Sequence, residues 1–532
     1  MHTTDSLIRR HEALGAERAR WESTWQDILD HVLPRRAGIL GADTPGARRG
    51  AKVYDSTPTR ALVRLAAALN SMLTNPASRW FHLEVEDPEQ NARQETRAWL
   101  EQVATAIQRG LEASNFATEV HETYLDLGCL GTACMFMEEG ADTDFNFSTR
   151  HIREVYVAED DKGRVDTVFR KFSLTARQML RRWGADACGE RIAEQARKKP
   201  EDRRDILHCV LPRDEWRPGR AGRENLPWAS VWVDLETRRR LDEGGYHEFP
   251  YCVPRWLKAS GEKYGRSPAL DALADIRTLN AMARTLLVTG EKVANPPLNV
   301  PDENTCVKNT PGGINYYDTR TMARIEPIAV GANLPLNFEM IREKRDAVAD
   351  AFFANQLQLI DSRRMTAEEV RARVAENLRV LGPTFGRLQS EFFAPVVARC
   401  YGILLRNGKL PEPPASLAGQ PIAVRYKSPL ARSQRAHEAQ AVSLLAGTAL
   451  DWARTLPEVL DNVDLDAAIR ALGEMDGVPA ELLRPVRQRD AMRKRRAALE
   501  EMRTRLALTQ GLAQANRTQA ESYRGLVGDT EQ

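Results

Sequence analysis

Three pairs of neighbouring carboxylates are the first residues in this sequence whose type and spacing could do chemistry. Each pair, Glu138-Glu139, Asp160-Asp161 and Glu368-Glu369, could supply the acid and the base of a proton transfer. The first two pairs stand beside glycines, where turns and surface charge account for them. The third stands in the first turn of a predicted helix, where the N-terminal dipole favours negative charge. We therefore interpret all three pairs as structural and not as a catalytic dyad.

Ligands for a metal or a redox centre are scattered along the chain. It has seven cysteines and nine histidines but no Cys-x-x-Cys, His-x-x-x-His or His-Glu-x-x-His spacing. It also lacks the glycine-rich phosphate loops of nucleotide enzymes and the Gly-x-Ser-x-Gly turn of hydrolases. The sequence therefore predicts no enzymatic activity, no cofactor and no metal, and it predicts buried, reduced cysteines in an intracellular protein.

Length and charge indicate a multidomain chain that is nearly neutral. The 532 residues suffice for about three or four domains, and no apolar run reaches the roughly 18 residues of a membrane span. The N-terminus is a charged helical pattern without a hydrophobic region, unlike a secretory signal. The formal net charge is +2, whereas a protein that binds many phosphates usually has a basic excess. Any contact with nucleic acid must therefore be local, weak or balanced by carboxylates.

Residues 336–410 carry the most regular pattern. A charged amphipathic segment, residues 336–353, precedes a polar break at residues 355–365. From Thr366, which forms a capping box with Glu369, apolar residues recur every three or four positions and predict a helix of roughly ten turns. The stripe consists of Val370, Val374, Leu378, Leu381, Phe385, Leu388, Phe392, Val396, Cys400 and Ile403. Gly382-Pro383 and Pro395 interrupt it, so the helix is expected to bend.

The remaining chain alternates between helical and strand patterns. Helices are predicted at residues 1–33, from Thr57, at 89–113, from 116, at 176–199, from Ser267-Pro268 and beyond 433. Strands are predicted at residues 80–85, 133–137, 151–157, 164–172, 205–211, 229–234, 251–256, 314–317, 323–328 and 422–426. Residues 217–226 and 242–245 are predicted loops. This order predicts an α+β fold that is mainly helical.

Two groups of basic residues could contact nucleic acid. Arg363 and Arg364 stand in the polar break, where a phosphate contact and a solvated loop are equal alternatives. Residues 487–505 hold eight basic residues against three acidic ones and could bind DNA or an acidic partner. A solvated helix face is the favoured alternative there. The eight are Arg487, Arg489, Arg493, Lys494, Arg495, Arg496, Arg503 and Arg505.

Several short motifs occur in an order that resembles a known family. They are Tyr54-Asp55-Ser56-Thr57, Trp80-Phe81, Ser114-Asn115-Phe116, Gly131-Thr132, Tyr264-Gly265-Arg266-Ser267-Pro268, Leu279-Asn280, Met365-Thr366-Ala367-Glu368-Glu369-Val370, Leu381-Gly382-Pro383 and Tyr426-Lys427-Ser428-Pro429-Leu430-Ala431-Arg432. Each is weak alone, but their order and spacing together are specific. Over most of its length, residues 21–499, the chain resembles the head-to-tail connector, or portal, proteins of short-tailed bacteriophages.

The resemblance implies a ring subunit with wing, stem, clip and crown regions. Residues 1–265 would form the wing, with its β-rich part at residues 132–256. Two stem helices, residues 266–293 and 336–354, would flank a clip at residues 294–335. A channel loop at 355–365, a bent long helix that returns to the wing at 366–432 and a helical crown at 433–532 would follow. A C-terminal barrel is one alternative for the end of the crown, before a frayed tail.

The resemblance also implies a function and partners. About twelve copies would form a ring at one capsid vertex, the channel for packaging and ejection of double-stranded DNA. Arg363, Arg364, Lys344 and Arg345 would contact this DNA without reading its sequence. A terminase packaging motor, tail adaptor proteins, and capsid and scaffolding proteins are the other implied partners, with no membrane. The protein would be a virion component, present in the host cytoplasm during assembly. A helical adaptor or scaffold protein that forms no ring is the alternative.

Overall fold

The chain divides into two units. The computed structural model describes residues 3–36, 38–41, 46, 49–76, 79–85, 87–217, 219, 222–300, 306–310, 312–316, 325–328, 334–354, 382–417, 429–475, 482–484 and 486–528. The first unit comprises residues 1–86, 102–412 and 421–431, and the second comprises residues 87–101, 413–420 and 432–532. Helices predominate and the sheets are antiparallel, which confirms the predicted α+β fold with mainly helical content.

Three helices near the N-terminus pack together in the first unit. α1 (Thr4–Val32) begins where Thr3 Oγ1 accepts a hydrogen bond from the Ser6 amide. α2 (Thr57–Leu73) begins after Asp55, whose carboxylate accepts the Thr57 amide at 2.8 Å. α5 (Phe116–Leu130) packs along α2. These helices confirm the predictions at residues 1–33, 57 and 116, and their fully buried side chains include Trp25, Leu62, Leu65, Leu69, Tyr124 and Leu127.

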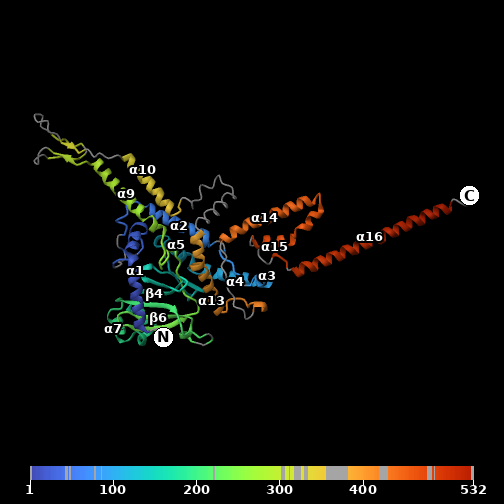
Figure 1. The fold of residues 1–532 in the computed structure, drawn as a ribbon, viewed down its shortest axis with the longest axis horizontal. Helices are drawn as coiled ribbons and strands as arrows, with labels where there is room; N and C mark the ends of the chain where they lie inside the picture. Colours follow the sequence, from blue (N-terminus) through green and yellow to red (C-terminus); the bar gives the residue numbers. More distant parts are fainter. Residues whose placement is uncertain are drawn as a thin grey trace. The chain divides into compact units, whose positions relative to one another are not determined.

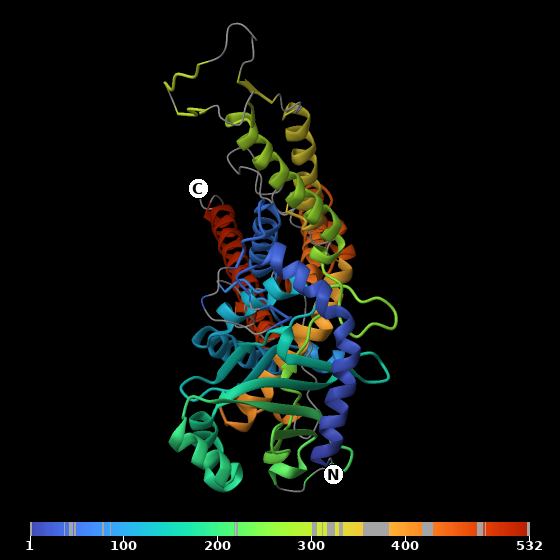
Figure 2. The ribbon, with the colours of Figure 1, turned by 90° about the vertical axis from the view of Figure 1, so that its left-hand side faces the viewer.

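A five-stranded antiparallel sheet lies in the same unit. Its strand order is β3 (Val155–Glu159), β4 (Val165–Thr175), β5 (Arg203–Pro212), β6 (Trp228–Asp234) and β7 (Arg239–Tyr246). Apolar residues of α1 cover one face, while α6 (Ala176–Cys188) and α7 (Glu190–Lys198) cover the other (Figure 2). Neighbouring residues Ile206 and Leu207 of β5 serve opposite faces, as the two-residue period of a strand requires.

A smaller antiparallel sheet joins β2 (Phe145–Thr149), β1 (Met135–Glu139) and β8 (Tyr251–Cys252). Short 3-10 turns occupy Ile152–Glu154 and Arg223–Asn225. The predicted strands at residues 133–137, 151–157, 164–172, 205–211 and 229–234 are confirmed with shifted ends. The strand predicted at 251–256 is confirmed only at residues 251–252.

Two expectations about the β-rich region are wrong. Residues 80–85 form no strand, although Phe81, Leu83 and Val85 are buried, because an extended segment can bury alternate side chains without a ladder. Residues 242–245 lie inside β7 and are not a loop. A Cβ on Gly245 would clash with the Trp228 carbonyl oxygen, so this glycine permits close strand approach instead of a turn.

A helical hairpin follows the sheets. Ser267 caps α8 (Pro268–Asp271), and α9 (Leu273–Ala294) continues from it. β9 (Leu298–Asn299) pairs with β10 (Glu326–Pro327) before α10 (Leu334–Ala351) returns beside α9 (Figure 1). The described residues 314–316 of one predicted strand form none, and the pairing uses residues 298–299 instead.

The long predicted helix is described from residue 382 onwards. α12 (Gly382–Leu388), a π turn (Gln389–Phe393) and α13 (Ala394–Arg406) follow without a break. The Ala394 amide donates to the Gln389 carbonyl, five residues back, immediately before Pro395, which has no amide hydrogen to donate. The predicted interruption at Pro395 therefore takes the form of a π turn. The predicted channel loop and the Thr366 capping box lie outside the described residues.

The second unit is helical. It contains α3 (Pro88–Ala92), the first turns of α4 (Gln94–Ala113), most of α14 (Pro429–Ala453), α15 (Leu465–Met475) and α16 (Val486–Gly528), with 3-10 turns at Ala415–Leu417 and Pro457–Asn462. The α15 carboxylate of Asp466 accepts hydrogen bonds from Arg489 at 3.0 Å and Arg493 at 2.8 Å, so these ion pairs hold α16 against α15. The helices predicted at 89–113 and beyond 433 are confirmed, and the strand predicted at 422–426 lies outside the described residues.

Candidate functional site at the α9–α10 helix pair

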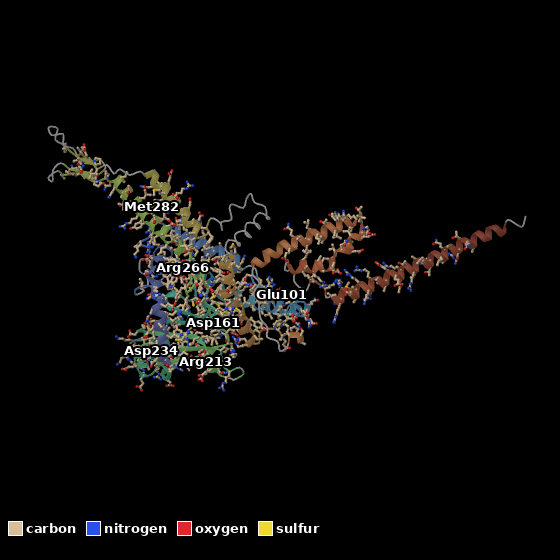
Figure 3. All side chains as sticks on the ribbon, viewed as in Figure 1. Glu101, Asp161, Arg213, Asp234, Arg266 and Met282 are labelled. Atoms are coloured by element: carbon tan, nitrogen blue, oxygen red, sulfur yellow. The ribbon has the colours of Figure 1, made fainter. Side chains whose placement is uncertain are left out.

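The α9–α10 pair is buried at one end and exposed at the other. Near the rest of the first unit, Ile276 and Leu279 of α9 and Ile341 and Val348 of α10 are buried. Met282 marks the middle of α9, and Arg266 precedes the hairpin at its buried end (Figure 3). Towards the distal end, large apolar side chains are exposed on both helices: Leu287, Val288, Val293, Phe338 and Met340. Exposed apolar side chains grouped on two adjacent helices indicate a contact with another molecule.

Two cations predicted to contact DNA lie on α10, and each forms an ion pair. Lys344 Nζ lies 2.7 Å from an Asp275 carboxylate oxygen on α9, and this hydrogen bond raises the pKa of Lys344. Arg345 Nε donates to the Asp55 carboxylate at 2.8 Å. Both cations remain partly exposed, whereas the Asp55 side chain is buried. The pairs leave this part of α10 with little unbalanced positive charge.

Asp55 is suited to hold Arg345. Burial alone would raise the pKa of Asp55, but hydrogen bonds from Thr57 and Arg345 outweigh it and hold the pKa below its usual value. The carboxylate therefore stays ionised over the neutral range while it caps α2 and pairs with α10.

Asn280 of α9 joins the same chain segment to the helix pair. Its Oδ1 accepts the Tyr54 amide at 2.7 Å, and its Nδ2 donates to the Lys52 carbonyl at 2.7 Å. A side-chain amide can accept one hydrogen bond and donate another to the backbone, as a residue on a neighbouring β-strand would. Residues 52–55 therefore brace both helices: α9 through Asn280 and α10 through the Asp55–Arg345 ion pair. We call residues 52–55 the brace.

The buried end of the hairpin rests on a close contact between two glycines. Gly131 ends α5 with φ +76°, and a Cβ at Gly131 or at Gly265 would clash with the other's carbonyl oxygen. Thr132 Oγ1 accepts the Gly265 amide at 2.7 Å, and Ser267 Oγ donates to the Cys129 carbonyl at 2.8 Å. This glycine contact sets the position at which α8 and α9 begin.

A buried arginine ties the same region to the π turn. Arg255 is fully buried, and its guanidinium and amide donate to Glu391 of the π turn at 2.6–3.2 Å. It also pairs with Glu159 of β3 and donates to the Gly163 and Lys263 carbonyls. Burial alone would lower the pKa of Arg255, but the two carboxylates reverse the effect and raise it. One charged side chain thus joins β3, the segment after β8 and the 382–406 helix.

The carboxylate pairs considered for catalysis have structural contacts where they are described. Glu138 lies in β1 and accepts a hydrogen bond from Asn146 of β2. Asp160 and Asp161 lie in the β3–β4 turn (Figure 3), where Asp160 Oδ1 accepts the amides of Lys162 and Arg164. Among the described residues no group of three or more potential ligands could hold a metal, and no described helix could span a membrane. Six cysteines are free and buried, as predicted, whereas Cys306 is exposed.

Comparisons with known proteins identify the family. The family model for the bacteriophage head to tail connecting protein matches residues 4–483. The chain belongs to this family. It is 31% identical over 513 residues to a probable portal protein of Bordetella phage BPP-1, which covers 94% of this chain and 92% of the relative. It is 30% identical over 530 residues to the portal protein of Salmonella phage epsilon15, covering 97% and 95%. The portal protein of Escherichia phage T7 is 22% identical over 434 residues, covering 76% of this chain and 75% of that protein.

Membership in the connector family confirms the resemblance and the portal function that it implied. The motifs that carried the resemblance also have physical roles in the structure. The Tyr54–Thr57 motif contains the Tyr54 and Asp55 contacts of the brace, and Leu279-Asn280 supplies its partner on α9. Gly131-Thr132 and the Gly265 motif form the glycine contact.

Sequence reasoning about this connector missed the pairing of its site residues. Lys344 and Arg345 were predicted as DNA contacts, and their ion pairs with Asp275 and Asp55 were not foreseen. Arg255 and Asn280 were not assigned any role, although Asn280 stands in a recognised motif. Arg363 and Arg364 lie outside the described residues, so their proposed contact with DNA stays a prediction.

Proposed function

We propose that this connector forms a ring of about twelve copies at one capsid vertex, with the α9–α10 pairs around a channel for double-stranded DNA. The observation that carries the proposal is the α9–α10 pair itself. Its exposed apolar side chains would be covered by neighbouring copies, as the burial of apolar surface favours. Two of its cations, Lys344 and Arg345, are balanced by carboxylates of the same chain.

The charge balance suits a channel through which DNA slides. Each uncompensated cation that binds a phosphate adds affinity and would slow movement. In our proposal Lys344 and Arg345 contact the DNA weakly, because Asp275 and Asp55 already hold them, and Arg363 and Arg364 of the channel loop contact it more directly. Binding would be independent of sequence, and packaging and ejection would use the same channel.

The other partners follow from the same ring. Residues 294–335, the proposed clip, would bind the terminase packaging motor during assembly and the tail adaptor proteins afterwards. The wing would contact capsid and scaffolding proteins. ATP hydrolysis would belong to the motor, so this chain would need no catalytic residue and no cofactor. It would assemble in the host cytoplasm and remain in the virion at the portal vertex.

Electron microscopy and native mass measurement of the purified protein test the ring. Closed rings of about twelve subunits with an axial channel are expected. A stable monomer under all assembly conditions would instead favour a helical adaptor or scaffold that forms no ring.

A packaging assay tests the DNA contacts. Arg363→Ala with Arg364→Ala should leave the ring intact and impair packaging or retention of DNA. If rings form and both activities stay at the wild-type level, the channel loop does not contact DNA.

A further inference from the structure

The second unit carries two exposed surfaces of opposite charge. The acidic surface consists of Asp451, Glu458, Asp461 and Asp464, between the end of α14 and the start of α15. The basic surface consists of Arg487, Lys494 and Arg495 at the start of α16. In the described part of the chain, Glu458, Asp461 and the basic surface form no ion pair with one another or with any other side chain.

The contact between α15 and α16 uses other residues. Asp466 pairs with Arg489 and Arg493, which lie four positions apart on one side of α16. At about 100° per residue, Arg495 lies roughly 200° around the helix from Arg493 and so faces away from α15. The chain's own α15 therefore leaves the side of α16 that carries Arg495 uncovered.

That uncovered side of α16 also carries an apolar stripe. Met492, Leu499, Met502 and Leu506 are separated by seven, three and four positions, so they share one helix face with Arg495. They are 43–62% exposed, and all described side chains of residues 491–520 are exposed. A matching feature accompanies the acidic surface, where Trp452 and Leu456 are 64% and 61% exposed.

We propose that the basic surface and apolar stripe of α16 in one copy bind the acidic surface, with Trp452 and Leu456, of the neighbouring copy. Opposite charges meet at the rim of this contact, and apolar side chains are buried between them. Because two different surfaces of the same chain bind each other, the contact is heterologous and is repeated around a ring. The inference rests on the proposed ring and specifies how its crown closes. DNA could pair with the charges of the basic surface, but it would neither cover the apolar stripe nor bind the acidic surface.

A charge exchange between two co-expressed variants tests this contact. The first, the α16 variant, carries Lys494→Glu and Arg495→Glu, and the second, the acidic-surface variant, carries Glu458→Lys and Asp461→Lys. In both, Cys306→Ser removes the exposed thiol. The α16 variant also carries Ala498→Cys, and the acidic-surface variant carries Asn462→Cys. A short bis-maleimide then reports when α16 of one copy lies beside the acidic segment of the next, and a tag on one variant distinguishes mixed pairs from like pairs.

Each variant should fail to contact an unaltered partner and succeed with the other variant. Each variant is first paired with a protein that has the wild-type charges and only the cysteine substitutions. Cross-linking in these pairs should fall by about tenfold relative to the wild-type pair, because like charges then face each other. Co-expression of the two variants should restore it to within about twofold of the wild-type pair, since every contact again joins opposite charges. Raising the salt from about 0.1 M to 1 M should weaken the wild-type cross-link, because it shortens the Debye length from about 10 Å to 3 Å.

The outcomes separate this inference from the proposed function. If rings with wild-type charges and the two cysteine substitutions form without any cross-link between residues 462 and 498, the crown contact is wrong and the proposed ring is unaffected. Failure of the wild-type protein to form rings overturns the proposed function. If the substitutions of the α16 variant abolish DNA binding by isolated rings, and the acidic-surface variant neither loses the cross-link nor restores it, the basic surface binds DNA instead.

Discussion

The two units of this connector use charge in opposite ways. In the first unit, Arg18, Arg204, Arg255 and Arg399 are almost fully buried, and each forms ion pairs or hydrogen bonds with carboxylates and carbonyls. In the second unit, the arginines of α16 stand on an exposed helix.

The difference teaches what each set of charges does. A buried ion pair adds little net stability over apolar packing, but removing one partner leaves a charge without compensation, so the pair holds one arrangement of the chain. Exposed pairs contribute little within a chain and remain available to another molecule. The buried pairs of the first unit therefore fix the elements that position the α9–α10 pair, and the exposed charges of the second unit remain available for the contact between copies that we propose.

The largest expected effect is at Arg255. Replacing Arg255 with alanine should lower the free energy of unfolding by about 3–5 kcal/mol, because Glu159 and Glu391 lose their fully buried partner and keep only the less buried Lys258 and Arg387. Urea denaturation followed by tryptophan fluorescence measures it. The matched control in the second unit is Arg505→Ala, which breaks an exposed pair with Glu501 and should change the value by less than about 0.5 kcal/mol. Equal losses would remove the contrast between the units.

Glycine substitutions should differ in sign between the units. Gly131→Ala should destabilise the protein by about 2–4 kcal/mol, since φ is positive there and the methyl group would meet the Gly265 carbonyl. Gly511→Ala in α16 meets no atom and should stabilise that helix by up to about 1 kcal/mol. Thermal unfolding of both variants measures the difference, and a tolerated Gly131→Ala would contradict the close glycine contact.

The pH dependence of stability should also have opposite signs at Asp126 of the first unit and at Asp466 of the second. Burial raises the pKa of Asp126 to about 6, despite its pair with Arg36, so the folded state binds a proton that the unfolded state releases. Stability from this group is present below its ordinary pKa and falls as pH rises to about 6, by at most about 3 kcal/mol. The Tm of the wild type should therefore fall relative to Asp126→Asn between pH 4 and pH 6 and stay level above it.

Asp466 supplies the control for this pH series. Its pKa is lowered, first by the hydrogen bond from Arg493, so its stabilisation is present at neutral pH and is lost as pH falls through the lowered pKa. Relative to Asp466→Asn, the wild-type Tm should therefore fall on acidification. A difference from Asp126→Asn that is constant between pH 4 and pH 7 would show that Asp126 does not titrate as described.

The smallest expected effect is at the brace. Asn280→Ala removes two hydrogen bonds to the backbone of residues 52–54 and should cost about 1–2 kcal/mol. Asn516→Ala on the exposed part of α16 should be neutral or slightly stabilising, because alanine favours helix. Hydrogen exchange of the Tyr54 amide gives a local measurement. Unchanged protection of this amide in Asn280→Ala would show that Asn280 does not hold the brace.

Most of the fold was predictable because its elements have strong local signals. The helices of residues 4–32 and 57–73 and the strands of the five-stranded sheet follow apolar periods and capping residues. The strand of residues 239–246 was misread because glycines that allow close strand approach resemble turn glycines. The strand of residues 145–149 was missed because it is short and half polar.

The site was less predictable because its contacts are distant in sequence. Asn280 and Tyr54 are 226 positions apart, and Arg345 and Asp55 are 290 apart. Periodicity describes one element at a time, so it placed Lys344 and Arg345 on a helix without showing which carboxylates they meet. Only the motifs at residues 54–57 and 279–280 pointed to those positions.

The π turn at Gln389–Phe393 has a consequence for insertions and deletions. It contains one residue more than an ordinary helix of the same length, and each helical residue adds about 100° of rotation. Because the π turn holds this extra residue within about one helical turn, removing one residue here would restore a regular helix and leave α13 in nearly the same phase relative to α12. Arg399 would then keep its hydrogen bonds to the carbonyls of Met137 and Glu248. Removing one residue of α13 before Arg399 would instead rotate Arg399 by about 100° and take it away from these carbonyls.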